Sequence, residues 1–156
     1  MSGGADRPPE GYLGADARIG KGPAPEMVEA GYRLEMADAP LLHRGSTLAD
    51  LAHVIALSEL GVIPTDQQAD LLGALLELAG IHADELDYDA GYGDAYNARE
   101  RWLAERIGPA AGWLPAGRPR REAGRIAFRI ALRERVLDLA EAVGRFAASL
   151  VEVAAR

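Results

Sequence analysis

Hydrophobic residues recur every three or four positions along most of the chain, the spacing that places them on one face of an α-helix. We expect helices over residues 25–37, 48–60, 65–80 and 94–107, and a last helix that begins near Pro119 and runs towards the end of the chain. β-branched and aromatic residues, which favour strands, are sparse. The pattern therefore predicts an all-α fold.

Turn and capping residues indicate where these helices begin and end. Pro40 is expected to end the first helix, because proline disfavours helical backbone in the residue before it. Ser46 or Thr47 is expected to cap the second helix. The sequence Thr-Asp-Gln-Gln at residues 65–68 predicts a capping box for the third. The short connection over residues 61–64 makes the second and third helices an αα-hairpin.

The last helix carries hydrophobic residues on more than one side. At 1.5 Å per residue, its residues to the end of the chain span roughly 54 Å. Leaving one stripe of seven large side chains in water forfeits roughly 14 kcal/mol, which is more than the stability of a typical domain. We therefore expect partner helices to cover it, and we expect the isolated chain to self-associate through residues 126–153. One such stripe consists of Phe128, Leu132, Leu139, Val143, Phe146, Leu150 and Val153.

Composition narrows the class of protein. The 156 residues suffice for one domain with an appendage, and the absence of cysteine excludes disulfide scaffolds and thiol chemistry. The first residues lack the basic and apolar regions of a signal peptide. No apolar run approaches the roughly 20 residues that span a bilayer. We expect a cytoplasmic protein without a membrane partner, whose residues 1–24, rich in Gly, Pro and Asp, form a flexible arm.

Charge is unevenly distributed along the chain. The formal net charge is −7, but residues 94–135 hold ten arginines and five acidic residues, a local balance of +5, which leaves −12 for the rest. A basic helix that binds nucleic acid is one interpretation of this local excess. The acidic total and the apolar faces of the same helix oppose it, so we expect no nucleic-acid partner and consider a small anion instead.

Three arginines, Arg118, Arg120 and Arg121, gather where the last helix begins, with Gly117 and Pro119 at its cap. The start of a helix already favours anions through its unpaired N–H groups and its dipole. Three cations there therefore require negative partners. These partners are either Asp and Glu side chains of neighbouring helices or a bound carboxylate or phosphate, which arginine grips with two hydrogen bonds.

Other candidate sites are weaker. His43, His53 and His82 are scattered without acidic residues at metal-ligand spacing, so we expect no metal, no catalytic triad and no cofactor. His53 is interpreted as a core or interface histidine with a satisfied hydrogen bond. The acidic loop over residues 87–93 lacks the spacing of a calcium loop, and Asp94 is expected to cap the helix that follows.

The arginine motif resembles a known family signature. Residues 114–122 read L-P-A-G-R-P-R-R-E and are similar to the L-H-T-G-R-S-R-N-D signature of argininosuccinate lyases, which also lies at the start of a long helix. Residues 94–108 resemble the E-D-I-H-S-x-V-E segment of that family at the same distance upstream. Residues 50–63 resemble its first hairpin, and residues 18–25 the entry arm of some members. The chain is thus identified as argininosuccinate lyase-like, within the fumarase/aspartase (fumarate lyase) superfamily, and as the N-terminal part only.

This resemblance implies an architecture and a reaction. A small helical domain precedes a bundle of long helices in the family, and the subunits assemble as homotetramers. We therefore expect a helical N-terminal lyase domain over residues 25–116 and the first long helix of the central bundle over residues 117–156. The implied reaction, part of arginine biosynthesis, breaks a C–N bond and releases fumarate. The implied substrate is argininosuccinate or a related amino-dicarboxylate.

Carried over position by position, the resemblance gives the expected substrate-binding residues. Arg120 stands at the substrate-contacting arginine of the family, and Arg118 at the arginine two positions before it. Arg121 stands at the family's Asn, Pro119 at its Ser and Tyr96 at its His. Replacing Asn with Arg exchanges a mixed donor and acceptor for a fixed cation, and this favours a different dicarboxylate.

Family subunits are much longer than this chain. The Thr-His segment and the mobile loop that supplies the catalytic base have no counterpart here, so we expect no catalytic residue within it. We expect a truncated lyase segment that is inactive alone and contributes an arginine-rich, dicarboxylate-binding helix start to a homo-oligomer or to a complementary C-terminal chain. The alternative is a non-catalytic helical oligomerisation or interaction module derived from this fold.

Overall fold

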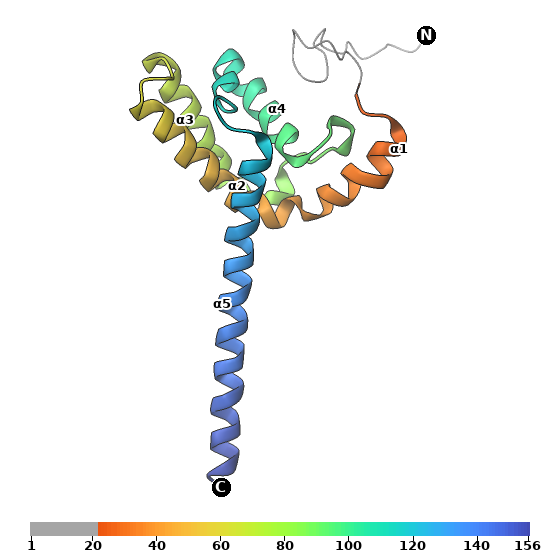
Figure 1. The fold of residues 1–156 in the computed structure, drawn as a ribbon, viewed down its shortest axis with the longest axis vertical. Helices are drawn as coiled ribbons and strands as arrows, with labels where there is room; N and C mark the ends of the chain where they lie inside the picture. The colour runs from red at the N-terminus through yellow and green to blue at the C-terminus, as the bar shows by residue number, and fades with distance from the viewer. Residues whose placement is uncertain (1–21) are drawn as a thin grey trace.

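A computed structural model describes residues 22–156, and every regular element in this range is a helix (Figure 1). The all-α prediction is confirmed. Residues 1–21 of the expected arm lie outside the described range. The elements are α1 (Pro25–Met27), a π-helical turn (Val28–Tyr32), α2 (Arg33–Glu59), α3 (Thr65–Gly80), α4 (Ala95–Ile107) and α5 (Arg120–Ala154), with 3-10 turns at Ala83–Glu85, Ala90–Tyr92 and Gly108–Trp113.

The predicted break near Pro40 is wrong, because Pro40 lies inside α2. Its ring is exposed, and the helical segment that begins with α1 curves on its way towards α3 (Figure 1). Proline removes one backbone hydrogen bond and bends a helix without having to end it. Thr47 is not a cap either. It is buried, and its hydroxyl donates to the carbonyl oxygen of His43 one turn earlier, at 3.0 Å. The two helices expected before residue 61 are therefore one.

The predicted αα-hairpin of α2 and α3 is confirmed. Gly61 follows the end of α2 with φ +68°, a left-handed conformation that glycine adopts without strain. The expected bounds of α3 are also confirmed. The predicted capping box is wrong, because Pro64 is the N-cap residue and no side chain caps the helix. Instead, the side-chain Nε2 of Gln68 donates to the carbonyl oxygen of Ile63, before the helix, at 2.7 Å.

The hydrophobic core lies between the C-terminal part of α2, the hairpin helix α3, α4 and the turn that follows α4. Asp94 caps α4 as predicted, since its Oδ1 accepts a hydrogen bond from the backbone N–H of Asn97 at 3.0 Å. Gly108, at φ +57°, ends the same helix. The core residues with no exposed surface are Val54, Leu71, Leu75, Leu78, Leu103 and Leu114.

α5 packs against α2 only through its first turns. Ala123, Ala127 and Ala131 are its buried residues, and they recur every four positions so that the two backbones approach closely at Gly45 of α2. Every residue of α5 after Ala131 is exposed, and Figure 1 shows this part leaving the body of the molecule as a free rod. Within residues 22–156, no helix has both the length and the apolar character that a membrane span requires.

Gly45→Ala is expected to destabilise the chain by about 1–3 kcal/mol, because the added carbon overpacks the crossing of α2 and α5. A Cβ at this position would lie 2.8 Å from Cα and 2.9 Å from the carbonyl oxygen of Ala127. The matched control is Gly73→Ala on α3, where the Cβ meets open space and alanine is favoured over glycine by about 1 kcal/mol. Urea unfolding followed by circular dichroism measures both. Equal stabilities for the two variants would contradict the close approach.

Candidate functional site

Three of the five expected substrate-binding residues lie together where α5 begins. The ring of Tyr96, on α4, lies near two guanidinium groups, with the Cζ of Arg118 at 6.0 Å and that of Arg120 at 5.7 Å from the ring centroid. Both distances are within reach of a cation–π attraction. Burial, together with the nearby Glu100 carboxylate, raises the pKa of Tyr96 to about 12. The Tyr96 hydroxyl is therefore protonated at neutral pH.

The other two expected residues, Pro119 and Arg121, are exposed. Pro119 is the N-cap residue of α5 and makes no side-chain hydrogen bond. Within the described residues, Arg121 makes no ion pair with a carboxylate. It lies close enough to Glu35 of α2 for its charge to lower the pKa of that carboxyl group, although burial raises this pKa overall.

Arg118 points into the protein. Its side chain is 3% exposed. Its Nη2 donates to Oδ1 of Asp50 at 2.5 Å, and its Nη1 donates to the carbonyl oxygen of Ala49 at 3.2 Å. A longer contact of 3.4 Å joins Nη2 to the hydroxyl oxygen of Tyr96. Both terminal nitrogens of Arg118 are thus used inside the protein.

Asp50 binds a second arginine. Its other oxygen, Oδ2, accepts a hydrogen bond from Nη2 of Arg99 at 2.9 Å, and the same nitrogen donates to the hydroxyl of Thr47 at 2.9 Å. Asp50 has no exposed surface and Arg99 has 1%. We call Asp50, Arg99 and Arg118 the buried charge cluster. It joins α2, α4 and the residues before α5, and it holds two cations against one anion.

The buried charge cluster also contains N–H groups without a hydrogen bond in the described part of the chain: Nε and Nη1 of Arg99 and Nε of Arg118. Buried donors without acceptors cost free energy. The excess positive charge and the unpaired donors both belong to the arginines, so Asp50 is the member on which the cluster depends.

Arg120 is paired with acidic residues nearer the surface. Its Nη1 donates to Oδ2 of Asp94 at 3.1 Å, and its Nη2 donates to Oε2 of Glu100 at 3.4 Å. Burial raises the pKa of Glu100 and the charge of Arg120 lowers it. The interpretation of the motif arginines as partners of neighbouring acids therefore describes Arg118 and Arg120, while Arg121 has no such partner within residues 22–156.

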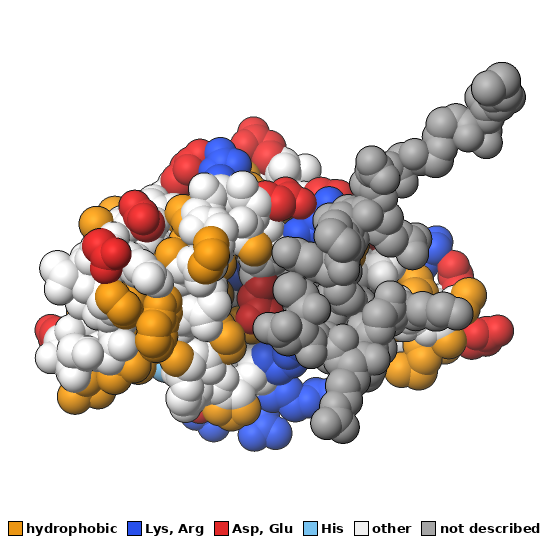
Figure 2. Space-filling model, turned by 90° about the horizontal axis from the view of Figure 1, so that it is seen from above, with side chains coloured by type: hydrophobic (Ala, Val, Ile, Leu, Met, Phe, Trp, Pro, Cys, Tyr) orange, Lys and Arg blue, Asp and Glu red, His pale blue; other side chains and the backbone are white. Residues whose placement is uncertain are grey.

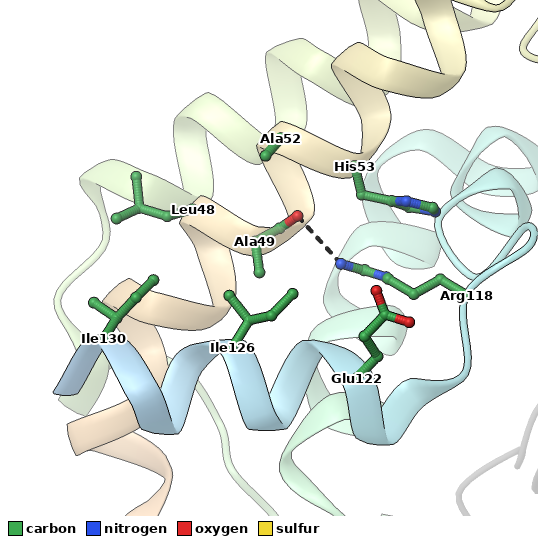
Figure 3. Close-up of a pocket in the computed structure, with 8 residues that line it drawn as sticks. All are labelled: Leu48, Ala49, Ala52, His53, Arg118, Glu122, Ile126 and Ile130. Carbon is green, nitrogen blue, oxygen red and sulfur yellow. Dashed lines mark hydrogen bonds between the residues drawn. The ribbon is translucent and has the colours of Figure 1, made fainter. Parts of the chain in front are cut away.

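A groove lies beside this site, between α2 and α5 (Figure 3). Its volume is about 380 Å³, and Arg118 crosses one end of it. His53 lies at the same end, with its Nε2 2.9 Å from the carbonyl oxygen of Ala116, so it has the satisfied hydrogen bond that the sequence predicted. Tyr96, Arg120 and Arg121 do not line the groove. The lining residues are Leu48, Ala49, Ala52, His53, Arg118, Glu122, Ile126 and Ile130.

The surface around the start of α5 has mixed charge. Arg120 lies there beside the acidic Asp94 and Glu100. On the face of the molecule seen in Figure 2, basic and acidic side chains likewise lie close to one another, and hydrophobic side chains are also exposed. Neighbouring charges of opposite sign weaken the field that attracts a distant anion. Among residues 22–156, no three His, Asp or Glu side chains are placed to hold a metal ion together.

A buried histidine adjoins the buried charge cluster. Nδ1 of His43 lies 2.8 Å from the hydroxyl of Tyr88, and its Nε2 lies 3.4 Å from the carbonyl oxygen of Leu78. Burial lowers the pKa of His43 below its ordinary value of 6.5, and the charge of Arg99 lowers it further. Protonation would add a third cation to this part of the core.

Stability is expected to fall as the pH drops below 6.5, because the unfolded chain then binds a proton that native His43 resists. The loss continues until the pH reaches the lowered native pKa. Glu35 and Glu100 act in the opposite direction and nearer pH 4.5, since their native pKa values are raised. Urea unfolding across this range measures the slope. His43→Gln should flatten it below pH 6.5, and an unchanged slope in the variant would contradict the assignment.

Comparison with known proteins identifies the family. The chain is 37% identical to the argininosuccinate lyase of Methanothrix thermoacetophila over 108 residues, which are 69% of this chain and 21% of that enzyme. It is 30% identical to that of Haloarcula marismortui and 31% identical to that of Methanopyrus kandleri, each over 137 residues, which are 88% of this chain and 26% of the relative. The chain is an argininosuccinate lyase-like member of the fumarate lyase superfamily.

This lyase-like chain spans about a fifth to a quarter of the length of the relatives that it matches. No model of a protein family matches it, and no solved structure matches it significantly. The family relation therefore rests on sequence similarity to the lyases.

Sequence analysis did not single out Asp50 or Arg99 of the lyase-like chain, although both carried a signal. Asp50 lies four residues before buried Val54 on the inner face of α2, and Arg99 lies four residues before buried Leu103 on the inner face of α4. Arg99 also stands where the E-D-I-H-S-x-V-E segment has Val. Charged residues are almost never fully buried without a partner, so two charges of opposite sign on inner helix faces indicate a buried ion pair.

Proposed function

We propose that this chain is the arginine-bearing helical portion of a cytoplasmic C–N lyase of the argininosuccinate lyase type. In this proposal residues 25–116 form the small domain and residues 117–156 the first helix of a larger bundle. The observation that carries it is the position of the arginine motif at the start of a helix whose outer part is exposed and hydrophobic. Other helices are needed to cover that part, and they would complete the surface around the arginines.

We propose that the substrate contacts Arg121 and the exposed edge of Arg120. Arg121 is exposed and the side chain of Arg120 is 38% exposed. A carboxylate of the substrate would replace Asp94 or Glu100 as the partner of Arg120, with the two charge-assisted hydrogen bonds that a guanidinium offers. Because the pKa of Glu100 is raised, this side chain gives up its negative charge more readily than an exposed glutamate.

The proposed reaction is an elimination. A base removes a proton from the carbon next to one carboxylate, the C–N bond breaks with its electron pair leaving on nitrogen, and fumarate forms. The substrate's carboxylates need cations while negative charge develops on them, and this is the part that we assign to Arg120 and Arg121. We propose that the base comes from a complementary chain, and that the substrate is argininosuccinate or a related amino-dicarboxylate.

Arg120→Ala is expected to weaken the binding of succinate about tenfold or more, because it removes a charge-assisted contact to the ligand. Titration calorimetry on the assembled chain measures the affinity. Arg125→Ala is the matched control, since it removes the same charge from an exposed position one turn later on α5. Equal affinities for the two variants would refute the assignment of Arg120. Fumarate release on mixing with the missing lyase segment, followed by ultraviolet absorbance, tests the activity.

A second candidate function is favoured by the ion pairs already described. Arg118 and Arg120 both have carboxylate partners within the chain, so a bound dicarboxylate is not required to balance them. On this reading the chain is a non-catalytic helical assembly module. Stable association through α5 with neither dicarboxylate binding nor fumarate release would favour the second function over the first.

A further inference from the structure

We infer that Asp50 is a positioning residue of the proposed dicarboxylate site: it holds Arg118 in the interior and, through Arg118, fixes the Tyr96 side chain near Arg120. The ligand in this inference rests on the proposed function. The positioning itself is a property of the chain and can be measured without a ligand.

Asp50 joins two segments of the chain to α2. Its two oxygens bind arginines from two different segments, Arg118 at 2.5 Å and Arg99 at 2.9 Å. Arg118 lies two residues before the first residue of α5. Tying its side chain to α2 therefore fixes the direction in which α5 begins, and with it the place of Arg120.

The terminal nitrogens of Arg118 are occupied by hydrogen bonds inside the protein. Nη1 and Nη2 donate to Ala49 and Asp50, and Nη2 also reaches the Tyr96 hydroxyl at 3.4 Å. A guanidinium held in this way is not available to a substrate. It acts as a support, and the ligand-facing groups of the motif are Arg120 and Arg121.

Tyr96 links Arg118 to Arg120 in the proposed site. The Cζ of Arg118 lies 6.0 Å and that of Arg120 5.7 Å from the centroid of the Tyr96 ring. Arg120 is held in turn by Glu100, which lies on the same helix as Tyr96. Moving Arg118 away would remove both its hydroxyl contact and its ring contact with Tyr96. Asp50 makes no ion pair with Arg120 within residues 22–156. Its charge also acts on Tyr96 and Glu100 directly, but its hydrogen-bonded path to the site runs through Arg118.

The test compares two variants that differ only at residue 50. Asp50→Asn alone leaves two buried cations without an anion and is expected to destabilise the fold. The test therefore does not use that single variant. Arg99→Met keeps Asp50 paired with Arg118, whereas Asp50→Asn combined with Arg99→Met leaves Arg118 as the one remaining ion of the buried charge cluster. Nitrogen NMR of the arginine side chains, assigned with Arg118→Lys, reports whether the guanidinium is locked.

Separate Nη signals from hindered rotation of Arg118 are expected in the native chain and in Arg99→Met, and one averaged signal is expected in the double variant. Separate signals in the double variant would overturn the inference, because Arg118 would then be held without Asp50. An averaged signal in the native chain would overturn it as well.

The pKa of Tyr96 gives a second readout. It shifts in opposite directions depending on whether Asp50 acts only through its charge or by holding Arg118. The charge of Asp50 raises the pKa of Tyr96, while the charge and hydrogen bond of Arg118 lower it by more. If Asp50 acts only through its charge, the double variant has a lower Tyr96 pKa than Arg99→Met. If Asp50 positions Arg118, the pKa rises and Tyr96 stays protonated at the highest pH at which the chain remains folded. Tyr96→Phe identifies the signal.

Succinate titration of the same pair completes the test. The double variant is expected to bind about tenfold more weakly than Arg99→Met, and equal affinities would remove the link between Asp50 and the ligand site. If neither variant nor the native chain binds succinate or fumarate, the proposed function fails. The guanidinium and tyrosine signals then still decide whether Asp50 is a positioning residue.

Discussion

Asp50→Asn is expected to lower the free energy of unfolding by about 3–5 kcal/mol, the cost of leaving a buried charge without its partner. Asp50 is the one anion in a buried charge cluster with two cations, and both of its oxygens are used. Asparagine has nearly the same shape, so the variant removes the charge without opening a cavity. One amide oxygen then faces two guanidinium groups, and the amide nitrogen donates towards one of them.

Arg99→Met is the matched comparison and is expected to change stability by only about 1 kcal/mol. It removes the cation with two unpaired nitrogens and leaves Asp50 and Arg118 as a balanced pair. Removing one partner of a buried ion pair is costly when it leaves a charge uncompensated, but here Arg118 still balances Asp50. Both variants are measured by denaturant unfolding at one fixed chain concentration, since association changes apparent stability. A larger loss in Arg99→Met than in Asp50→Asn would show that charge balance does not govern this cluster.

The continuous α2 shows why the sequence pattern placed one helix break wrongly. The buried stripe of this helix crosses Pro40 without interruption, with Ala39 before it and His43 after it on the same face. Further along, the helix also buries Thr47 and Asp50, so three of its eight buried residues are polar. A search for hydrophobic spacing does not detect such a stripe. Packing on α4 and α5 outweighs the local cost of the proline.

The candidate site was also predictable only in part. The place of the arginine motif, at the start of a long helix and next to Tyr96, followed from the sequence. Its pairing did not, because Arg118 meets Asp50 across 68 positions of the chain. That contact depends on how closely α5 crosses α2, and Gly45 and three alanines set this distance. Small residues at a helix crossing give only a weak sequence signal, so the side chains that meet there are not predictable from spacing.

The outer part of α5 was predictable, because its pattern is local. The expected stripe is present and exposed, and the structure adds Val136 to it. From Leu132 onward, with Phe128 left out, the spacing of the set alternates between four and three residues over three heptads, which is the pattern of left-handed coiled coils. Each member is at least 50% exposed. The set consists of Leu132, Val136, Leu139, Val143, Phe146, Leu150 and Val153.

Four substitutions in this set, Leu139→Glu, Val143→Lys, Phe146→Lys and Leu150→Glu, are expected to convert an associated chain into a monomer. At about 2 kcal/mol for each buried side chain, the four together contribute up to roughly 8 kcal/mol to association. A loss of that size weakens the dissociation constant by up to nearly six orders of magnitude. Sedimentation velocity at micromolar concentration measures the change, and circular dichroism checks that the helices before α5 remain folded.

The matched control changes the polar side of the same segment. Glu141 and Arg145 form an exposed ion pair one turn apart, and pairs of this kind contribute about 0.3–0.5 kcal/mol. Glu141→Ala with Arg145→Ala is therefore expected to leave the native chain associated. A native chain that sediments as a monomer would contradict the prediction outright. Association that survives the four charged substitutions would place the interface elsewhere, and the hydrophobic groove between α2 and α5 would then be the surface to mutate.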